Sequence, residues 1–169
     1  RFNISEEKAF VSGKTANQPN GLLNGIDSVT TAGVGSISMD DIKKLFFNVS
    51  SQYRTRASWL LSDNAGYLLS VLKGADGQYL WQPSLQAGVP DLLHGKPVFY
   101  SPGMPSGATG EIPIAFGDFS YYWVADRSGI FVQRLVEKYS EPGQVGFRDF
   151  RRVDGQLMLN AAVKGLNIK

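Results

Sequence analysis

The pattern of apolar positions predicts an amphipathic helix between residues 39 and 53. Apolar side chains recur there about every 3.6 residues, at Met39, Ile42, Leu45, Phe46, Val49 and Tyr53. This period places them on one stripe of a helix, and the stripe would face a core. Ser38 precedes the segment and Asp41 is its third residue, so a cap and an acid both favour a helix start here.

The chain before this helix reads as a helix end followed by a loop. Residues 6–11 have the composition of the last turns of a helix, and Gly13 follows as a stop signal. Residues 15–35 are rich in Gly, Asn, Thr and Ser, which is typical of a loop whose glycines supply positive φ angles.

After residue 53 the sequence predicts a short strand and then a second helix. Residues 57–61 are an apolar strand candidate. The helix is expected to start at residue 62 or 63 and to run to about Lys73, where Gly74 would end it. Residues 75–77 would then turn the chain.

From Pro97 onward the sequence is typical of β-structure. Pro, Gly, Asp and Ser separate five strand candidates, which are residues 97–101, 112–126, 129–137, 144–153 and 156–168. Residues 126–129 (Asp-Arg-Ser-Gly) are predicted to form a tight turn between antiparallel strands 117–126 and 129–137, and Asp154-Gly155 is the dipeptide preferred in two-residue hairpins. Helices early and strands late indicate an α+β fold.

Composition narrows the functional classes. The 169 residues are 43% hydrophobic, enough for one or two modest cores. The net charge of +2, from 17 basic and 15 acidic side chains, does not fit a strongly basic nucleic-acid-binding domain. Without cysteine there is no disulfide or thiolate metal site. No window approaches the roughly 20 apolar residues of a membrane span, so no membrane partner is expected. Because the chain begins at Arg1, we expect it to be part of a longer parent.

Motifs for catalysis and cofactor binding are weak. His94 is the only histidine and lies beside a Gly-Lys-Pro turn, and no serine stands in a Gly-x-Ser-x-Gly elbow. A site with several histidine ligands is therefore impossible. Gly13-Lys14-Thr15 lacks the earlier glycine of a phosphate-binding loop, whose place Lys8 holds. The sequence predicts no catalytic, metal or cofactor-binding residue, and no enzyme.

Carboxylate chemistry stays open as an alternative from another functional class. An acid and a base could be assembled from Asp118, Asp126, Glu137, Asp149 and Asp154. Several of these lie in expected turns or among arginines, where ion pairing is the ordinary explanation. A carboxylate-dependent hydrolase, or a sugar-binding module that uses the three tryptophans and the tyrosines, is therefore the less favoured reading.

The segment FRDFRRVDG, residues 147–155, is unusual for a strand because it carries three arginines among aromatic residues. Guanidinium groups there could bind an anion. The segment is too charged for a buried core and too apolar for open solvent, and Arg and aromatic residues are enriched at subunit interfaces. We therefore favour an interface.

Five motifs follow one another along almost the whole chain: EEKAFVSGKTANQPNGLL, LLSDNAGYLLSVLKGADGQYLWQP, LLHGKPVFYSPGMP, IAFGDFSYYWVADRSGIFV and FRRVDGQLMLNAAVKGL. Together, and in this order, they resemble the carboxy-terminal part of the major capsid protein family of tailed bacteriophages, which has the Hong Kong phage-type capsid fold. The first is similar to the passage where the family's long spine helix ends. The fourth is similar to the family's Phe-Gly-Asp-Phe, aromatic and Asp-Arg-x-Gly hairpin.

The resemblance implies a two-domain organisation. Residues 1–22 would be the end of the spine helix and a peripheral-domain segment, residues 23–130 the axial domain, residues 131–153 peripheral-domain strands, and residues 154–169 a return strand to the axial domain. The amino-terminal arm, the extended loop and most of the spine helix of the family are expected to be missing from this chain.

The resemblance also implies a structural function. Copies of the parent would form rings of five and six that close into the icosahedral head of a phage or prophage. The head would enclose double-stranded DNA without sequence specificity, with a scaffold or a maturation protease as possible further partners. The protein would lie in the virion capsid, and in the bacterial cytoplasm during assembly. An encapsulin-like compartment is the alternative with the same fold. No cofactor is implied, and the candidates for subunit contact, chosen by their chemistry, are Arg127, Arg134, Arg148, Arg152 and Asp154.

Overall fold

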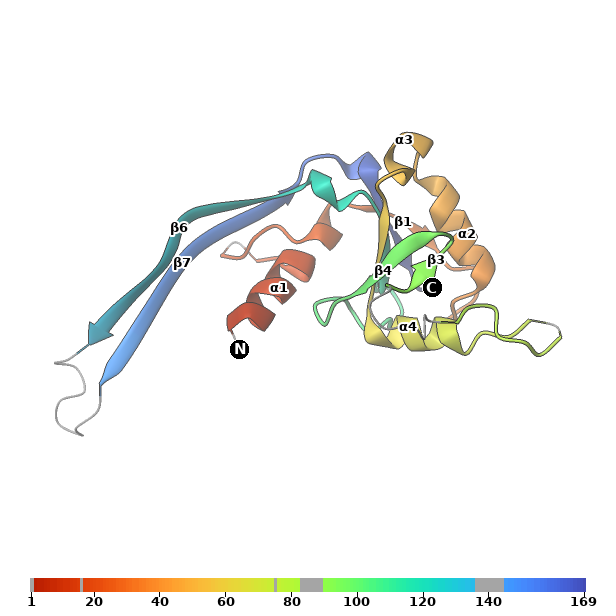
Figure 1. Cartoon of the computed structure of the whole chain (residues 1–169), viewed down its shortest axis with the longest axis horizontal. Helices are drawn as coiled ribbons and strands as arrows, with labels where there is room; N and C mark the ends of the chain where they lie inside the picture. Colours follow the sequence, from red (N-terminus) through yellow and green to blue (C-terminus); the bar gives the residue numbers. More distant parts are fainter. Residues whose placement is uncertain (1, 16, 75, 83–89, 136–144) are drawn as a thin grey trace.

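The computed structural model describes residues 2–15, 17–74, 76–82, 90–135 and 145–169. These residues form two parts (Figure 1). One is a six-stranded sheet with its helices, called the main sheet below, and the other is a long two-stranded ribbon that projects away from it. The helices and strands confirm the α+β class.

The main sheet mixes parallel and antiparallel pairs. Its order is β1-β8-β5-β2-β4-β3, with β1 parallel to β8, β2 parallel to β4, and the other neighbours antiparallel. The strands are β1 Asp27–Thr30, β2 Ser58–Leu61, β3 Leu92–Leu93, β4 Lys96–Tyr100, β5 Ile114–Gly117 and β8 Val163–Asn167. Every residue of β5 is buried, because both faces of the sheet are covered at its centre.

Helices α2 (Met39–Asn48) and α4 (Asp63–Ser70) contribute buried residues to the core on one face of the sheet, and the short helix α3 (Ser51–Arg54) adds the partly buried Tyr53. Trp59 and Phe116 are fully buried there with ring centroids 4.1 Å apart, and the Trp59 indole donates to the Leu93 carbonyl at 2.9 Å. The predicted apolar stripe packs against them, since Ile42, Leu45 and Val49 have no exposed surface. This face holds the larger core.

The second face carries a smaller core, which attaches α1 (Phe2–Ser12) and the base of the ribbon to the sheet. Its buried members come from α1, the 3-10 helix η1 (Leu22–Asn24), the loop after β4, the sheet, the residue just before β8 and the ribbon: Val11, Leu22, Met104, Ala115, Leu157, Ala162 and Val163. One core therefore fixes the ribbon relative to the main sheet.

The ribbon consists of β6 (Tyr122–Leu135) and β7 (Gly146–Leu157). The short helices η2 (Phe119–Tyr121) and η3 (Asn160–Ala162) connect it to β5 and β8. The antiparallel register runs from Tyr122 opposite Leu157 to Leu135 opposite Gly146.

Both hairpin turns predicted from the sequence are wrong. Residues 126–129 lie inside β6, where the pairing with β7 shifts between Asp126 and Ser128 and again between Ser128 and Phe131. The turn-forming residues accommodate β-bulges, which take up extra residues and bend a strand without reversing it. Asp154 and Gly155 likewise lie within β7, opposite Ala125 and Val124. Gly155 is needed for packing, because a Cβ there would lie 2.4 Å from the Tyr122 hydroxyl.

Three further predictions differ from the structure in detail. The 39–53 helix forms, but Val49 adopts an extended conformation and divides it into α2 and α3. The next helix begins after its Ser62 cap as expected and ends at Ser70, earlier than predicted. The 15–35 loop contains β1, a polar edge strand that the sequence pattern does not reveal because its pairing with β8 is long-range. None of the helices in the described part of the chain has the length and apolar character that a membrane span requires.

Candidate subunit-contact surface

Helix α1 braces one face of the ribbon at its base. The Phe10 ring meets Tyr122 edge-to-face at 6.4 Å, and the Tyr122 hydroxyl donates to the Asn20 carbonyl at 2.9 Å. Burial, and then the charge of Asp154, raise the pKa of Tyr122 to about 12. Tyr122 therefore stays a neutral hydrogen-bond donor at physiological pH.

Arg151 joins the two strands of the ribbon to α1. Its guanidinium donates to Asp126 on β6 at 2.8 and 3.1 Å and contacts Glu6 on α1 at 3.0 Å. The hydrogen bond to Asp126 and the two negative charges raise the pKa of Arg151. The sequence indicated ion pairing for this arginine-rich segment, but Glu6 is 145 residues away and could not be identified as a partner.

The five candidate contact residues all lie exposed on the ribbon. Side chains alternate between the faces of a strand. Alternation along β7 places Arg148, Arg152 and Asp154 on the face opposite to that of Arg151. Arg134 pairs with Phe147 and therefore shares the Arg151 face, and Arg127 lies within a bulge. The structure gathers the candidates on one element but not on one face, and their role in subunit contact stays a prediction.

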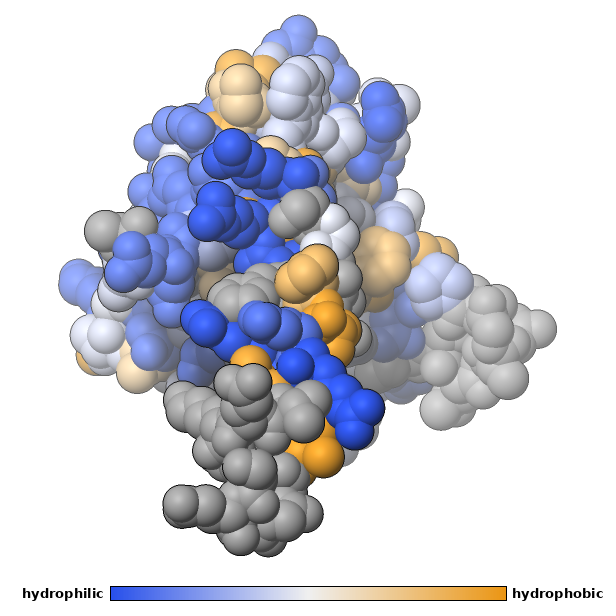
Figure 2. All heavy atoms as spheres, turned by 90° about the vertical axis from the view of Figure 1, so that its left-hand side faces the viewer, coloured by the Kyte–Doolittle hydropathy of each residue, from blue (hydrophilic) through white to orange (hydrophobic). Residues whose placement is uncertain are grey.

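Large apolar side chains are exposed on both faces of the ribbon. The most exposed aromatic residues are Trp123 at 65%, Phe131 at 64% and Phe147 at 68%. The others on the ribbon are Val124 and Val132, and Val145 and Met158 are exposed immediately before and after β7. Figure 2, which looks at the molecule from the side to which the ribbon projects, shows hydrophobic residues interleaved with hydrophilic ones. Exposed apolar groups of this kind, next to arginines, are typical of a surface that other chains cover.

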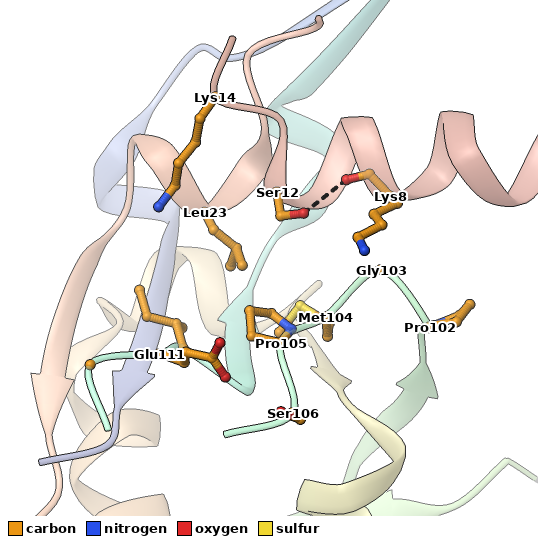
Figure 3. Close-up of a pocket in the computed structure, with 12 residues that line it drawn as sticks. Lys8, Ser12, Lys14, Leu23, Pro102, Gly103, Met104, Pro105, Ser106 and Glu111 are labelled. Carbon is orange, nitrogen blue, oxygen red and sulfur yellow. Dashed lines mark hydrogen bonds between the residues drawn. The ribbon is translucent and has the colours of Figure 1, made fainter. Parts of the chain in front are cut away.

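A cavity of about 500 Å³ lies between the end of α1 and the loops around residues 102–106 and 110–112 (Figure 3). Lys8 and Lys14 line one side, and Glu111 is the single carboxylate among the described lining residues. Glu111 accepts hydrogen bonds from the backbone N–H groups of Gly107 and Ala108. Its carboxylate therefore holds a turn, and the described lining of the cavity contains no second carboxylate to form a pair with it.

The other carboxylates weighed from the sequence also have structural surroundings. Asp118 accepts from the Ser120 N–H at the start of η2 and lies 4.0 Å from Arg56. Asp126 and Asp154 occupy adjacent rungs of the ribbon but point to opposite faces. Asp149 faces Val132 across the ribbon, and Glu137 lies outside the described residues.

His94 lies in a tight turn, as predicted. Leu93 and Lys96 are paired, and the two residues between them, His94 and Gly95, have positive φ angles of 49° and 71°, the pattern of a two-residue hairpin. Its ring lies 5.5 Å from the Phe46 ring. Among the described residues, no cluster of three or more histidines and acids could hold a metal ion.

The fold and this surface define a class: an α+β protein with an exposed ribbon suited to contact with other chains. The sequence matches the phage capsid family over residues 1–168, and the chain belongs to that family. Family and fold together indicate a structural protein.

Solved structures that resemble this chain include capsid proteins, in agreement with the family assignment. The capsid chains of an empty and a native GTA particle, both computed with C5 symmetry, have a TM-score of 0.88 with 31% and 30% sequence identity. The matches cover 99% of this chain and 62% and 61% of those chains. A chain of Microbacterium phage Oxtober96 shares the fold at TM-score 0.73 and 18% identity, over 98% of this chain and 61% of that one. The present chain thus spans about three fifths of the length of these structures. No curated protein matches it.

Proposed function

We propose that this chain is the carboxy-terminal part of a major capsid protein that assembles into rings of five and six and closes into an icosahedral phage or prophage head. The observation that carries the proposal is the ribbon, which exposes aromatic residues and arginines on both faces. Family membership and the likeness to capsid chains of GTA particles support it.

The ribbon needs further contacts to be stable. An isolated two-stranded ribbon is marginally stable in water, and α1 covers only one face at the base. Burying the exposed Phe131 and Trp123 against a neighbouring subunit would remove apolar surface from water and fix the ribbon. Contacts that are weak singly become strong when a closed ring repeats them, because each contact raises the effective concentration for the next.

The main sheet and the projecting ribbon would belong to two different domains. The main sheet would be the axial domain, and α1 with the outer ribbon would lie in the peripheral domain, so that 23–130 and 131–153 belong to different domains. Arg127, Arg134, Arg148, Arg152 and Asp154 would then pair with residues of neighbouring subunits.

The shell would hold double-stranded DNA without sequence specificity, in keeping with the nearly balanced charge. The protein would lie in the virion capsid, and in the bacterial cytoplasm during assembly, where a scaffold or a maturation protease would act on it. An encapsulin-like shell would instead contain a cargo protein, so the nucleic-acid content of purified particles distinguishes these two functions.

The test is to assemble the complete gene product with Phe131→Ser and to compare it with Val34→Ser, an exposed apolar residue outside the ribbon. Both side chains are exposed, so both variants should fold as the parent does. We expect the Phe131 variant to lose most of its particles in a density gradient and the Val34 variant to keep them. Equal particle yields would contradict the proposed role of the ribbon.

A further inference from the structure

One end of the main sheet, where α2 meets α3, presents an exposed aromatic residue held by an arginine. Phe47 is 70% exposed and meets Phe46 edge-to-face at 5.3 Å. The Arg54 guanidinium lies 5.4 Å from the Phe46 ring centre and 5.3 Å from that of Phe47, a cation–π arrangement. The two side chains are therefore ordered before any partner arrives, which lowers the entropy cost of binding.

Further cations surround this pair. Arg56 is exposed, and Lys96 donates to the carbonyl of Thr55, the residue between the two arginines, at 2.9 Å. Within the described part of the chain, the one acid paired with these cations is the buried Asp118, at 4.0 Å from Arg56. We call Phe47, Arg54, Arg56 and Lys96 the basic end.

The opposite end of the sheet, at α4 and the turn after it, combines aromatic residues with acids. Tyr67 is 65% exposed, and Tyr79 and Leu80 are also exposed. Asp63 begins α4, and Asp91 accepts a hydrogen bond from Tyr100 at 3.0 Å. Burial, this hydrogen bond and the charges of both acids raise the pKa of Tyr100 to about 12. The acidic end is defined as Asp63, Tyr67, Asp76, Tyr79 and Leu80. Lys73 lies 5.0 Å from the Tyr79 ring centre, so the two carboxylates exceed the cations at this end by one charge.

The two ends are separated by the length of a strand. β2 runs from Ser58, which follows α3, to Leu61, which precedes α4. Figure 1 shows α3 and α4 at opposite ends of the main sheet. Two complementary surfaces at different places on one chain produce a head-to-tail contact, and such contacts close into rings when the rotation permits.

We propose that the basic end of one copy docks on the acidic end of the next copy. Phe47 and Tyr67 are the aromatic anchors, and Arg56 and Asp63 supply opposite charges, which favour the correct orientation. The same chain carries both halves of the contact, which favours a second copy over another partner. This inference rests on the proposed function and adds to the ribbon a second contact, between the main sheets of neighbouring subunits.

Because the chain has no cysteine, disulfide trapping can test the contact. One chain carries Gln52→Cys on α3 and the other carries Gln78→Cys near Tyr79, so that no anchor is changed. The control replaces Gln52→Cys by Gln18→Cys, another exposed glutamine, in the loop after α1. After mixing and mild oxidation, we expect the 52–78 heterodimer to form about tenfold faster than the 18–78 heterodimer, because docking raises the effective thiol concentration.

A charge exchange gives the second readout. Arg56→Asp in the Gln52→Cys chain should slow the trapping, and Asp63→Arg in the Gln78→Cys chain should restore it. Equal rates for the 52–78 and control pairs would overturn the inference, as would binding of duplex DNA to the basic end without a cross-link above control. If the complete gene product forms shells that lack this cross-link, the contact is wrong while the proposed function stands. If it forms no shells, the proposed function itself fails.

Discussion

At the residue scale, the close contacts of two residues, Gly117 and Asp41, leave little room for substitution. Gly117 ends β5 where a Cβ would lie 2.2 Å from the Ala162 carbonyl oxygen and 2.6 Å from the Val163 Cα. Asp41 is fully buried at the start of α2 and forms a reciprocal capping box with Ser38. Both positions help to place the elements that carry the proposed contacts.

Replacing Gly117 by alanine should destabilise the protein by roughly 1–3 kcal/mol, because the methyl group would overlap backbone atoms that cannot rotate away. Gly129→Ala is the matched control, since no atom lies within 4 Å of a Cβ there and its φ is outside the left-handed region. Urea denaturation of both variants measures the difference. Equal midpoints would show that the packing around Gly117 is looser than described.

Asp41 should make the free energy of unfolding depend on pH in the acid range. Burial alone would raise the pKa of Asp41, but hydrogen bonds from the Ser38 hydroxyl and from the Ala32 and Ser38 N–H groups, with Lys44 nearby, hold this pKa below its ordinary value. The carboxylate therefore stabilises the fold above the pKa of the unfolded chain. This contribution is lost as the pH falls from about 4 through the lowered pKa of the folded state.

Asp41→Asn should accordingly cost roughly 1–3 kcal/mol at neutral pH and flatten the pH dependence below about pH 4. Asp40→Asn is the control, because Asp40 is exposed and forms a surface ion pair with Lys43, at 3.3 Å. Thermal unfolding between acid and neutral pH gives the comparison. A variant at Asp41 with the parent's pH profile would show that this carboxylate does not carry the effect.

At the element scale, local signals predicted the elements that local interactions determine. Ser38 and Asp41 cap α2, and Ser62 accepts from the Ala65 N–H at the start of α4, as their residue types indicate. The ribbon could not be predicted in the same way. Its turn-like residues 126–129 lie in bulges, because β7 supplies their pairing partners. The ion pair between Arg151 and Glu6 depends on the tertiary fold, which brings these two distant residues together.

Removing the Arg151 bridge should loosen the ribbon from α1. In Arg151→Gln, we expect the amide protons of α1 and of the ribbon base to exchange several-fold faster than in the parent, because Glu6 and Asp126 lose their shared partner. Arg152→Gln, an exposed neighbour on the other face, should leave exchange unchanged. Hydrogen exchange followed by mass spectrometry distinguishes the variants. Unchanged exchange in both would show that the other contacts at the base, those of Tyr122 with Phe10 and Asn20 and of Leu157 with the smaller core, hold the ribbon without the Arg151 bridge.

At the scale of the whole molecule, the sequence allowed three features to be predicted: the α+β fold class, the capsid family, and the mixture of arginines and aromatic residues on the segment that forms β7. The order of five motifs along the chain indicated the capsid family, which the family match confirms. What it could not give was which residues of β6 lie opposite which residues of β7, because two separate bulges of one residue each, between Asp126 and Ser128 and between Ser128 and Phe131, shift the pairing. The basic and acidic ends also depend on residues far apart in sequence, such as Arg54 and Lys96.

The most direct test of the shell function is electron microscopy of the complete gene product expressed in bacteria. We expect closed shells whose rings contain five and six copies, with Trp123, Phe131 and the arginines of β7 buried between subunits. Shells in which both ribbon faces remain exposed to solvent would contradict the role of the ribbon. A product that stays monomeric at high concentration, under conditions where a folded main sheet is verified, would contradict the shell function itself.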